Sequence, residues 1–298
     1  MRCLLPILAF GTLLLTVGCT PPWSSVVNPP KQATYMSQTP TAQQLVGQLN
    51  ATSQRLRSLE FREVDIQAKQ GHQSIDVLGM MMCQPPRDFR LTAKVIGQPA
   101  LDLGSNSQEF WFWLSKDERP GLYFCSYADL ARGGVRLPFP FQPAWVMEAL
   151  GMADRNPDGA YEPVKATRDT FELIERTTGP QGQPVRKVTI FSRTQSLAVL
   201  GHRLEDGSGK EICTAQILER RADQTAQVVV PARVQLTWPA AQLTMKLKLD
   251  DMRVNAGIDP DRAQAAFRRP QLKNVPLYDL AQMSQSPNTI QRTGGPIR

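Results

Sequence analysis

The chain has 298 residues, 41% of them hydrophobic and 20% charged, which is enough apolar sequence to bury the core of one large domain or two smaller ones. Its formal net charge is +7, but the lysines and arginines are scattered and form only short doublets such as Arg220-Arg221 and Arg268-Arg269. Because nucleic-acid binding needs clustered positive charge, this pattern argues against a nucleic-acid partner. A mild positive excess fits a protein close to anionic lipid head groups better.

The N-terminal stretch predicts a signal peptide followed by a lipid anchor. Arg2 gives a positive start, residues 4–15 form an apolar run that is short for a membrane span, and small residues precede Cys19. Small residues that end at a cysteine resemble the bacterial lipobox, with Thr16 where leucine is commoner. A plain secretory signal or a membrane helix is the alternative. We expect a leader over 1–18 and acylation, including palmitate, at the anchor cysteine.

Cysteine and histidine usage gives no sign of a metal site. Besides the leader cysteine and the anchor cysteine, three cysteines remain: Cys83, Cys125 and Cys213. Three is an odd number, so at most one disulfide can form, and its pairing stays open. None belongs to a CxxC pair, and the two histidines, His72 and His202, lie far apart in the sequence. We therefore expect buried cysteines that act as small hydrophobes, no metal and no cofactor.

A proline-rich tether and then an amphipathic helix follow the anchor. Paired prolines with Ser, Thr and Asn make residues 19–40 an extended linker. Thr41 suits the N-cap of a helix that runs to Leu59. Its apolar residues recur at helical spacing and form one stripe: Leu45, Leu49, Leu56 and Leu59. We expect this helix to lie on a surface with the stripe turned inward.

After the helix the apolar period changes to two, which predicts strands. Residues 61–66 and 74–83 form the first two. The sequence LTAKVIGQPALDLGSNSQEFWFWL then predicts a hairpin, with arms over 91–103 and 110–114 and a turn over 104–108. The second arm, FWFWL, is apolar on both faces, so it needs a core on one side and a helix, a lid or a ligand on the other. The alternative is an ordinary strand inside a sandwich core.

A proline-stiffened loop and a short helix occupy the middle of the chain. Residues 123–127 form a strand, and the loop over 137–143 carries Phe139 and Phe141 between prolines, which exclude a central strand. Residues 144–152 predict a short amphipathic helix. The loop and the helix together make either a lid over an apolar groove or an ordinary crossing between strands.

The second half of the chain is a run of strands. Their expected ranges are 171–176, 185–192, 196–204, 211–219, 228–238 and 243–254. The turn over 206–209 links two of them, and a short helix over 260–267 closes the body. About eleven strands against two or three helices predict a mainly β fold with an antiparallel sheet.

The sequence carries no catalytic signature. Neither a Gly-x-Ser-x-Gly elbow nor a phosphate-binding loop is present. His202 lies close to Glu205 and Asp206 but precedes a turn, so we interpret it as a solvated histidine at a strand end. Asp250 and Asp251 point to opposite faces of a strand and cannot share a substrate or a metal. We therefore expect a protein without enzymatic activity.

The order of these parts resembles the LolA/LolB superfamily of lipoprotein carriers and receptors. The resemblance rests on the P-x-x-F-R-L corner at 86–91, on Leu-Gly-Ser-Asn at 103–106, on Phe-Trp-Phe-Trp at 110–113, and on the placement of the two helices. It implies one domain over 41–270: a half-open, unclosed β-barrel covered by an N-terminal helix and a mid-chain helical lid. A C-terminal extension over 271–298, disordered at its end, would follow.

The resemblance also implies a groove that receives the acyl chains of lipoproteins or lipids. Its candidate walls are Leu101, Leu103, Phe110, Trp111, Phe112, Trp113, Phe124, Trp145 and Met147, together with the methionines at 80–82. The candidate membrane-facing loop contains Leu137, Phe139 and Phe141. Thr20 after the anchor cysteine implies, by the sorting rule of Gram-negative bacteria, the outer membrane on its periplasmic side.

Two functions from different classes fit this sequence. A carrier or receptor predicts an internal or semi-open apolar cavity, whereas a structural or protein-interaction lipoprotein of the envelope predicts that the same aromatic side chains fill a closed core. In both cases we expect a monomer that is held at a membrane by its lipid anchor.

Overall fold

The computed structural model describes residues 36–115, 120–135, 137, 142–194, 196–257 and 259–285. The predicted leader, Cys19 and most of the tether lie outside these residues, as does the chain after residue 285. The described elements belong to one compact unit that begins at Tyr35.

Fifteen strands of the described residues form one sheet. In chain order they are β1 (Leu59–Gln70), β2 (Gln73–Gln84), β3 (Asp88–Val95), β4 (Gln98–Ser105), β5 (Glu109–Leu114), β6 (Leu122–Ser126), β7 (Ala160–Tyr161), β8 (Lys165–Ala166), β9 (Thr170–Thr178), β10 (Pro184–Ser192), β11 (Val199–Asp206), β12 (Glu211–Asp223), β13 (Val228–Trp238), β14 (Leu243–Val254) and β15 (Leu277–Asp279). The order across the sheet is β15-β6-β5-β4-β3-β2-β1-β14-β13-β12-β11-β10-β9-β7, and β8 also pairs with β9.

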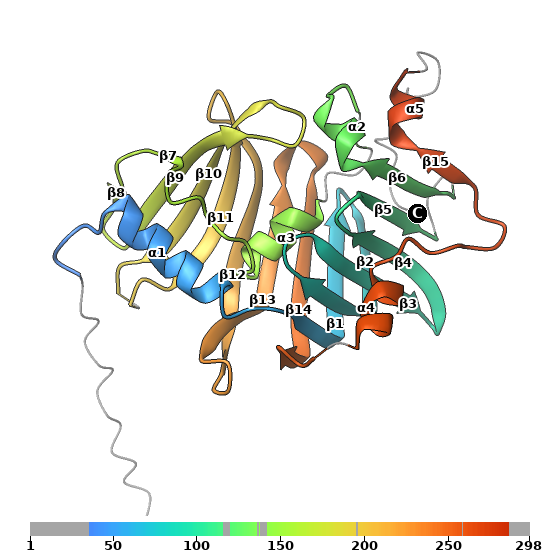
Figure 1. The fold of residues 1–298 in the computed structure, drawn as a ribbon, viewed down its shortest axis with the longest axis horizontal. Coiled ribbons are helices and arrows are strands. Elements are labelled where there is room, and N and C mark those ends of the chain that lie inside the picture. Colours follow the sequence, from blue (N-terminus) through green and yellow to red (C-terminus); the bar gives the residue numbers. More distant parts are fainter. Residues whose placement is uncertain are drawn as a thin grey trace, which may run out of the picture. The chain divides into compact units, whose positions relative to one another are not determined.

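The sheet is built from two meanders that meet in the middle. β1 to β6 step away from the centre in one direction and β14 to β9 in the other, while β1 pairs with β14 along its whole length. Every pair is antiparallel except β15 with β6. β15 and β7 remain as edges, so the sheet does not close (Figure 1). The expected mainly β, antiparallel and unclosed architecture is confirmed.

The predicted hairpin over residues 91–114 contains one more reversal than expected. The turn before β5 is confirmed, because the Asn106 side chain accepts hydrogen bonds from the backbone N–H groups of Gln108 and Glu109. The first arm, however, splits into β3 and β4 at Ile96 and Gly97, whose φ angles are +48° and +77°. Such a two-residue turn needs positive φ at both positions, which an isoleucine rarely adopts, so the apolar run hid the turn.

The helices are α1 (Ala42–Ser53), α2 (Tyr127–Ala131), α3 (Pro143–Ala149), α4 (Pro260–Ala266) and α5 (Leu280–Gln285), with a single 3-10 turn η1 (Pro239–Ala241). None of the helices in the described ranges is long and apolar enough to cross a membrane. Thr41 caps α1 as predicted, in a reciprocal capping box with Gln44. α1 ends earlier than expected, because the Asn255 side chain binds the backbone of Arg57 and Ser58 and directs the chain into β1.

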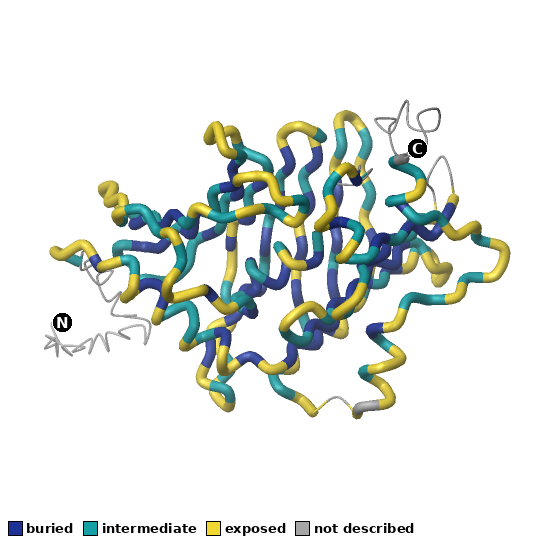
Figure 2. The backbone as a smooth tube through the Cα atoms, turned by 45° about the horizontal axis from the view of Figure 1, so that its top comes forward, coloured by how far each residue is buried: buried dark blue, intermediate teal, exposed yellow. Residues whose placement is uncertain are grey.

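α1 and α3 lie across one face of the sheet, which we call the inner face (Figure 1). α3 covers the larger cluster of buried side chains, which runs over β1–β6 and β10–β14. α1 covers a smaller cluster, in which Leu45 and Val46 pack on Phe171, Leu173 and Phe191. Figure 2 shows the buried positions along the strands and the exposed ones at the connections. Both predicted covers are therefore present.

The C-terminal segment adds to the sheet on the side of β6. Residues 277–279 form β15 as a parallel neighbour of β6, and Tyr278 stacks on Tyr123 with 5.2 Å between the ring centroids. The Tyr278 ring fills the space that a side chain at Gly121 would need. The extension predicted from residue 271 thus contributes a strand and α5 to the body, and its predicted disordered end lies outside the described residues.

Candidate functional site

α3 is the lid of the inner face. Pro143 begins the helix, which has no side-chain cap at its N-terminus, and Gly151 follows it with a φ of +80°. Val146, Met147 and Ala149 are buried against the large inner cluster. A helix of seven residues is not stable alone in water, so these tertiary contacts hold α3 in place.

A small cavity lies between α3 and the strands beneath it. Its volume is about 30 Å³. The lining residues are Gln142, Trp145, Val146 and Glu148 from α3 and its N-cap, Lys187 from β10, His202, Arg203 and Leu204 from β11, Cys213 and Ala215 from β12, and Leu236 and Trp238 from β13. This space has room for a water molecule but not for an acyl chain. In this conformation α3 is packed on the inner face, and the gap beneath it is small.

Charged side chains, one of them buried and the others half-buried, surround one end of the cavity. Arg155, which follows α3 in the chain, places its Nη2 2.5 Å from Glu148 Oε1 and its Nη1 3.1 Å from Glu175 Oε2. Lys187 Nζ lies 3.0 Å from the other oxygen of Glu148. Burial alone would raise the pKa of Glu148, but Arg155 and Lys187 outweigh it and hold that pKa well below its ordinary value. The lid thus carries an ionised carboxylate clamped by two cations.

Arg155 also connects the lid to α1. Asn50 of α1 accepts a hydrogen bond from the Arg155 backbone N–H (2.7 Å) and donates one to its carbonyl oxygen (2.8 Å). Beside it, Ser53 donates to Asp154 at 2.5 Å. One arginine therefore joins α1, α3 and β9, so both covers are held by the same residue.

His202 lies at this polar end and not at a solvated strand end, which corrects the prediction from sequence. β11 continues to Asp206, so His202 is an interior strand residue whose ring meets the cavity. Its Nδ1 is 3.2 Å from Thr189 Oγ1. Burial, opposed by Glu148 and aided by Arg155 and Lys187, lowers the pKa of His202 to about 4. The imidazole is therefore neutral near pH 7.

The predicted groove residues divide between the two faces of the sheet. Leu101, Leu103, Phe110, Phe112 and Met147 belong to the inner cluster, and Trp145 packs against it. Trp111, Trp113 and Phe124 point to the opposite, outer face, because side chains alternate along each strand. Of the three methionines, only Met81 belongs to the inner cluster. The predicted walls therefore cannot all line one groove.

The outer-face aromatic residues are covered by the segment around α4. Trp111 donates from its indole Nε1 to Asp102 at 3.1 Å, and Arg90 lies 2.5 Å from the same carboxylate. Arg90 also donates to the carbonyl oxygens of Ala266 and Arg268, both at 2.9 Å. The second cover that the FWFWL strand requires is thus the chain's own C-terminal segment.

The predicted membrane-facing loop is described only in part. Leu137 packs against the inner cluster, and Phe139 and Phe141 lie outside the described residues. Within the described ranges the large apolar side chain with the greatest exposure is Ile96, at 97%. Sequence reasoning missed it because Ile96 was placed inside a strand; the following Gly97 was the signal of a turn.

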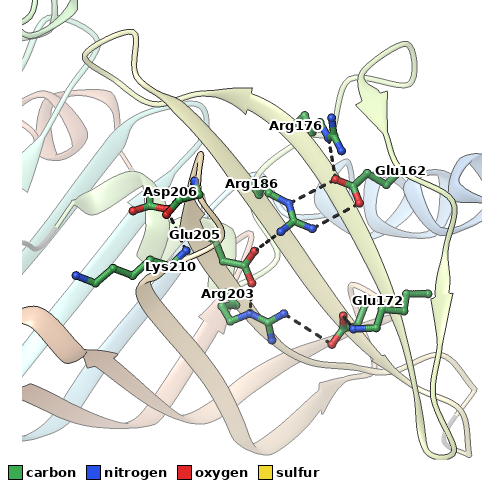
Figure 3. Close-up of polar contacts among 10 residues, drawn as sticks. Glu162, Glu172, Arg176, Arg186, Arg203, Glu205, Asp206 and Lys210 are labelled. Atoms are coloured by element: carbon green, nitrogen blue, oxygen red, sulfur yellow. Dashed lines mark hydrogen bonds and ion pairs between the residues drawn. The ribbon is translucent and has the colours of Figure 1, made fainter.

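An ion-pair network stiffens the outer face of the strands that carry Lys187 and Thr189. In Figure 3, Arg186 lies between Glu162 and Glu205, and Arg203 between Glu205 and Glu172. The network covers two apolar side chains that are buried on this face, Val188 and Ile174. Opposite charges alternate in this network, which lies on the other face of the strands that carry Lys187 and Thr189.

The three cysteines are buried and unbonded. Burial and the carboxylates of Glu148 and Glu211 raise the pKa of the Cys213 thiol to about 12, so it stays protonated. In the described part of the chain, no three His, Cys, Asp or Glu side chains gather in a way that would hold a metal ion.

Solved structures with the same fold include bacterial envelope proteins. The chain superposes on an outer membrane lipoprotein-sorting protein domain from Vibrio parahaemolyticus with a TM-score of 0.52 and 11% identity, over 75% of this chain and 96% of that one. A LolA superfamily protein from Nitrosomonas europaea gives 0.50 and 13%, over 78% and 99%. A DUF1329 family protein from Desulfovibrio piger gives 0.51 and 8%, over 76% and 98%. The expected LolA-like fold is confirmed.

Neither protein-family models nor curated proteins give a match to this sequence. The likeness is therefore one of fold, and the function has to be argued from the site.

Proposed function

We propose that this chain is a lipoprotein of the bacterial envelope, anchored through Cys19, that binds the acyl chains of lipoproteins or lipids beneath α3 without catalysing a reaction. The observation that carries the proposal is the cavity under the lid, whose far wall is the apolar surface of β11–β13. An apolar wall of this kind accepts hydrocarbon with little loss, because few polar groups have to give up hydrogen bonds.

Binding requires α3 to move. The cavity of about 30 Å³ is too small for a chain, so an acyl chain would take the place of Val146 and Met147 on the inner cluster. The ligand would cover the apolar surface that the lid leaves, so opening exchanges one apolar cover for another. α3 is short and lacks an N-terminal side-chain cap, which lowers the cost of moving it.

We further propose that the protein faces the periplasm from the outer membrane as a monomer. Ile96 and the loop from Leu137 to Phe141 are the candidates for contact with lipid. A side chain that is 97% exposed on a two-residue turn can enter the interfacial region without any change of fold. The sorting-protein name of one fold neighbour agrees with this location.

The second candidate is a structural or protein-interaction lipoprotein. The observation in its favour is the packing of the described inner face, where aromatic and aliphatic side chains are buried and the gap under α3 is small. The two functions differ in a single property, which is whether α3 yields to a ligand.

The test is native mass spectrometry of the chain from Thr20 onward, purified from bacterial envelopes without detergent. The proposed function predicts co-purifying lipid or acyl-peptide mass. Ala215→Phe fills the cavity from β12 and should remove that mass, whereas Gln216→Phe adds the same ring to the exposed face of the same strand and should not. A clean apo mass, with no uptake of an apolar fluorescent probe, would contradict the proposal and favour the structural protein.

A further inference from the structure

The stretch of chain between β14 and β15 crosses the outer face of the sheet, and we call residues 256–276 the strap. Its described residues form no strand, and its one helix is the seven-residue α4. Among the described residues of the strap, Phe267 alone is buried, and it belongs to neither cluster of the inner face. One buried apolar side chain and a set of polar contacts therefore hold the strap on the sheet.

Three consecutive backbone carbonyls at the C-terminal end of α4 accept hydrogen bonds from side chains of the sheet. Arg90 Nη1 donates to the carbonyl oxygens of Ala266 and Arg268, both at 2.9 Å. Asn106 Nδ2 donates to the carbonyl oxygen of Phe267 between them, at 3.1 Å. A helix leaves its last carbonyls free, and its C-terminal end attracts a cation. The outer face therefore recognises the end of a helix through its backbone.

Two arginines of the strap add contacts with acidic and aromatic side chains of the sheet. The guanidinium carbon of Arg269 lies 3.8 Å from the centroid of the Phe124 ring, and its Nε is 3.2 Å from Glu109 Oε1. Near the start of α4, Arg262 Nη2 is 2.6 Å from Glu60 Oε1. Without the strap both carboxylates would lose these partners, so the uncovered face would attract a positively charged segment.

The fit between the strap and the sheet is incomplete. Three buried nitrogen donors in this region have no acceptor among the described residues: Arg90 Nε, Trp113 Nε1 and Arg269 Nη1. A buried donor without an acceptor costs free energy, so the strap leaves part of the hydrogen-bonding capacity of this face unused. A segment that brings one more acceptor would pair with a donor of the sheet and compete with the strap.

We propose that the outer face of β3–β6 is a docking site for the C-terminal end of a helix from another protein, with an aromatic residue at the place of Phe267 and an arginine two residues later. Residues 266–269 occupy this site in cis, and the partner takes their place. The proposal goes beyond ligand binding beneath α3 and does not depend on it, because it concerns the opposite face of the sheet.

The experiment offers the site a copy of its own occupant. A labelled peptide with the sequence of residues 260–272 is titrated into the chain from Thr20 onward and followed by fluorescence anisotropy. In the wild type the strap competes at an effective concentration on the order of millimolar, so the peptide should bind weakly. Phe267→Ala loosens the strap and should bind the peptide at least about tenfold more tightly. Gln264→Ala changes an exposed side chain of α4 and should bind it like the wild type.

Variants of the sheet assign the binding to this face. In the Phe267→Ala background, Glu109→Gln removes the ionic partner of the peptide's arginine and should weaken peptide binding by about three- to tenfold. Glu63→Gln changes an exposed carboxylate of β1 and should leave the peptide affinity unchanged. Far-UV circular dichroism of each variant checks that the sheet is folded.

The outcomes separate this proposal from the proposed function. Equal peptide affinities of folded Phe267→Ala and the wild type would overturn it, and so would a Phe267→Ala affinity that Glu109→Gln leaves unchanged. A wild-type chain that forms dimers and takes up no peptide would also overturn it, because the strap of a second copy would then be the occupant. None of these outcomes bears on the proposed function, which is measured by uptake of an apolar probe beneath α3.

Discussion

The two helices that cover the inner face do so by different means. α1 packs Leu45 and Val46 directly on Phe171 and Phe191, and all four side chains are almost fully buried. α3 packs through apolar residues as well, but it lies above a cavity and carries Glu148 into a cluster of buried charges. One helix is twelve residues long with a capping box, and the other is seven residues long without a side-chain cap.

The different contacts of α1 and α3 indicate which helix would leave the sheet when a ligand binds. Separating α1 from the sheet would expose aromatic and aliphatic surface to water, which is unfavourable in proportion to its area. Separating α3 would release Glu148 and Lys187 to solvent, which hydrates them well and offsets part of the cost of breaking their ion pairs. In the proposed function α1 therefore stays in place and α3 is the helix that moves.

The largest effect is expected in the α1 cluster. Phe171→Ala removes a fully buried ring and should lower the free energy of unfolding by about 3–5 kcal/mol. Urea unfolding of the variant and the wild type measures this loss of stability. Uptake of an apolar probe by the folded protein should stay as in the wild type, because the α3 site is intact. A variant that gained probe binding would show that α1 also opens.

The second-largest loss of stability is expected when Arg155, which joins α1 and α3, is replaced. Arg155→Met leaves Glu148 and Glu175 buried without their main partner and should cost about 3 kcal/mol. Lys187→Met is the matched control, since Lys187 is more exposed and pairs with Glu148 alone; we expect under about 1 kcal/mol. Equal losses in the two variants would contradict the role of Arg155 as the joint clamp.

Acid should weaken the α3 side first. The pKa of His202 is lowered to about 4 in the folded chain, against about 6.5 when unfolded, so the unfolded state binds more protons between these values. Stability should therefore fall as the pH drops from 6.5 to 4, by on the order of 2 kcal/mol. Glu148 keeps its full contribution down to about pH 4.5, its ordinary pKa, and begins to lose it only below that pH, because its pKa in the folded chain is lowered.

Thermal unfolding across this pH range tests the assignment to His202. His202→Gln has no titrating group at that position and should lose this part of the pH dependence, while His72→Gln should keep it. An unchanged profile in His202→Gln would place the titration elsewhere.

The smallest effect is expected at the tip of the β3–β4 turn. Ile96 has a φ of +48° and makes almost no contact, so Ile96→Asn should raise the free energy of unfolding by about 1 kcal/mol, because asparagine tolerates this conformation. The same change should reduce binding to anionic phospholipid vesicles if this turn touches the membrane. A loss of stability would contradict the turn geometry.

The spacing of apolar residues was enough to predict the architecture, but not which residues line the site. Alternation along the strands from residue 171 to 254 matches β9–β14 closely, because apolar and polar positions repeat every second residue. The FWFWL segment is apolar on both faces, and this predicted correctly that each face packs against another part of the chain. Period alone could not tell which face of that strand met the lid, so outer-face Trp111 and inner-face Phe112 were assigned to one groove.

The polar cluster was beyond sequence reasoning for a physical reason. Glu148, Arg155, Lys187 and His202 come from α3, the loop after it, β10 and β11, and only the packing of α3 on the sheet brings them together. In the sequence each looks like an ordinary surface residue. A carboxylate inside the otherwise apolar α3 helix was the one local signal, and it becomes meaningful only when the lid is in place.

The account depends on an acyl chain entering beneath α3. The direct measurement is photo-crosslinking with a glycerol monoacyl ester that carries a diazirine along its chain, followed by mass spectrometry of the labelled peptides. The account predicts labels on α3 and on the inner-face residues of β11–β13, including Leu204, Ala215 and Leu236. Labels confined to the outer face, or none on the folded protein, would contradict it.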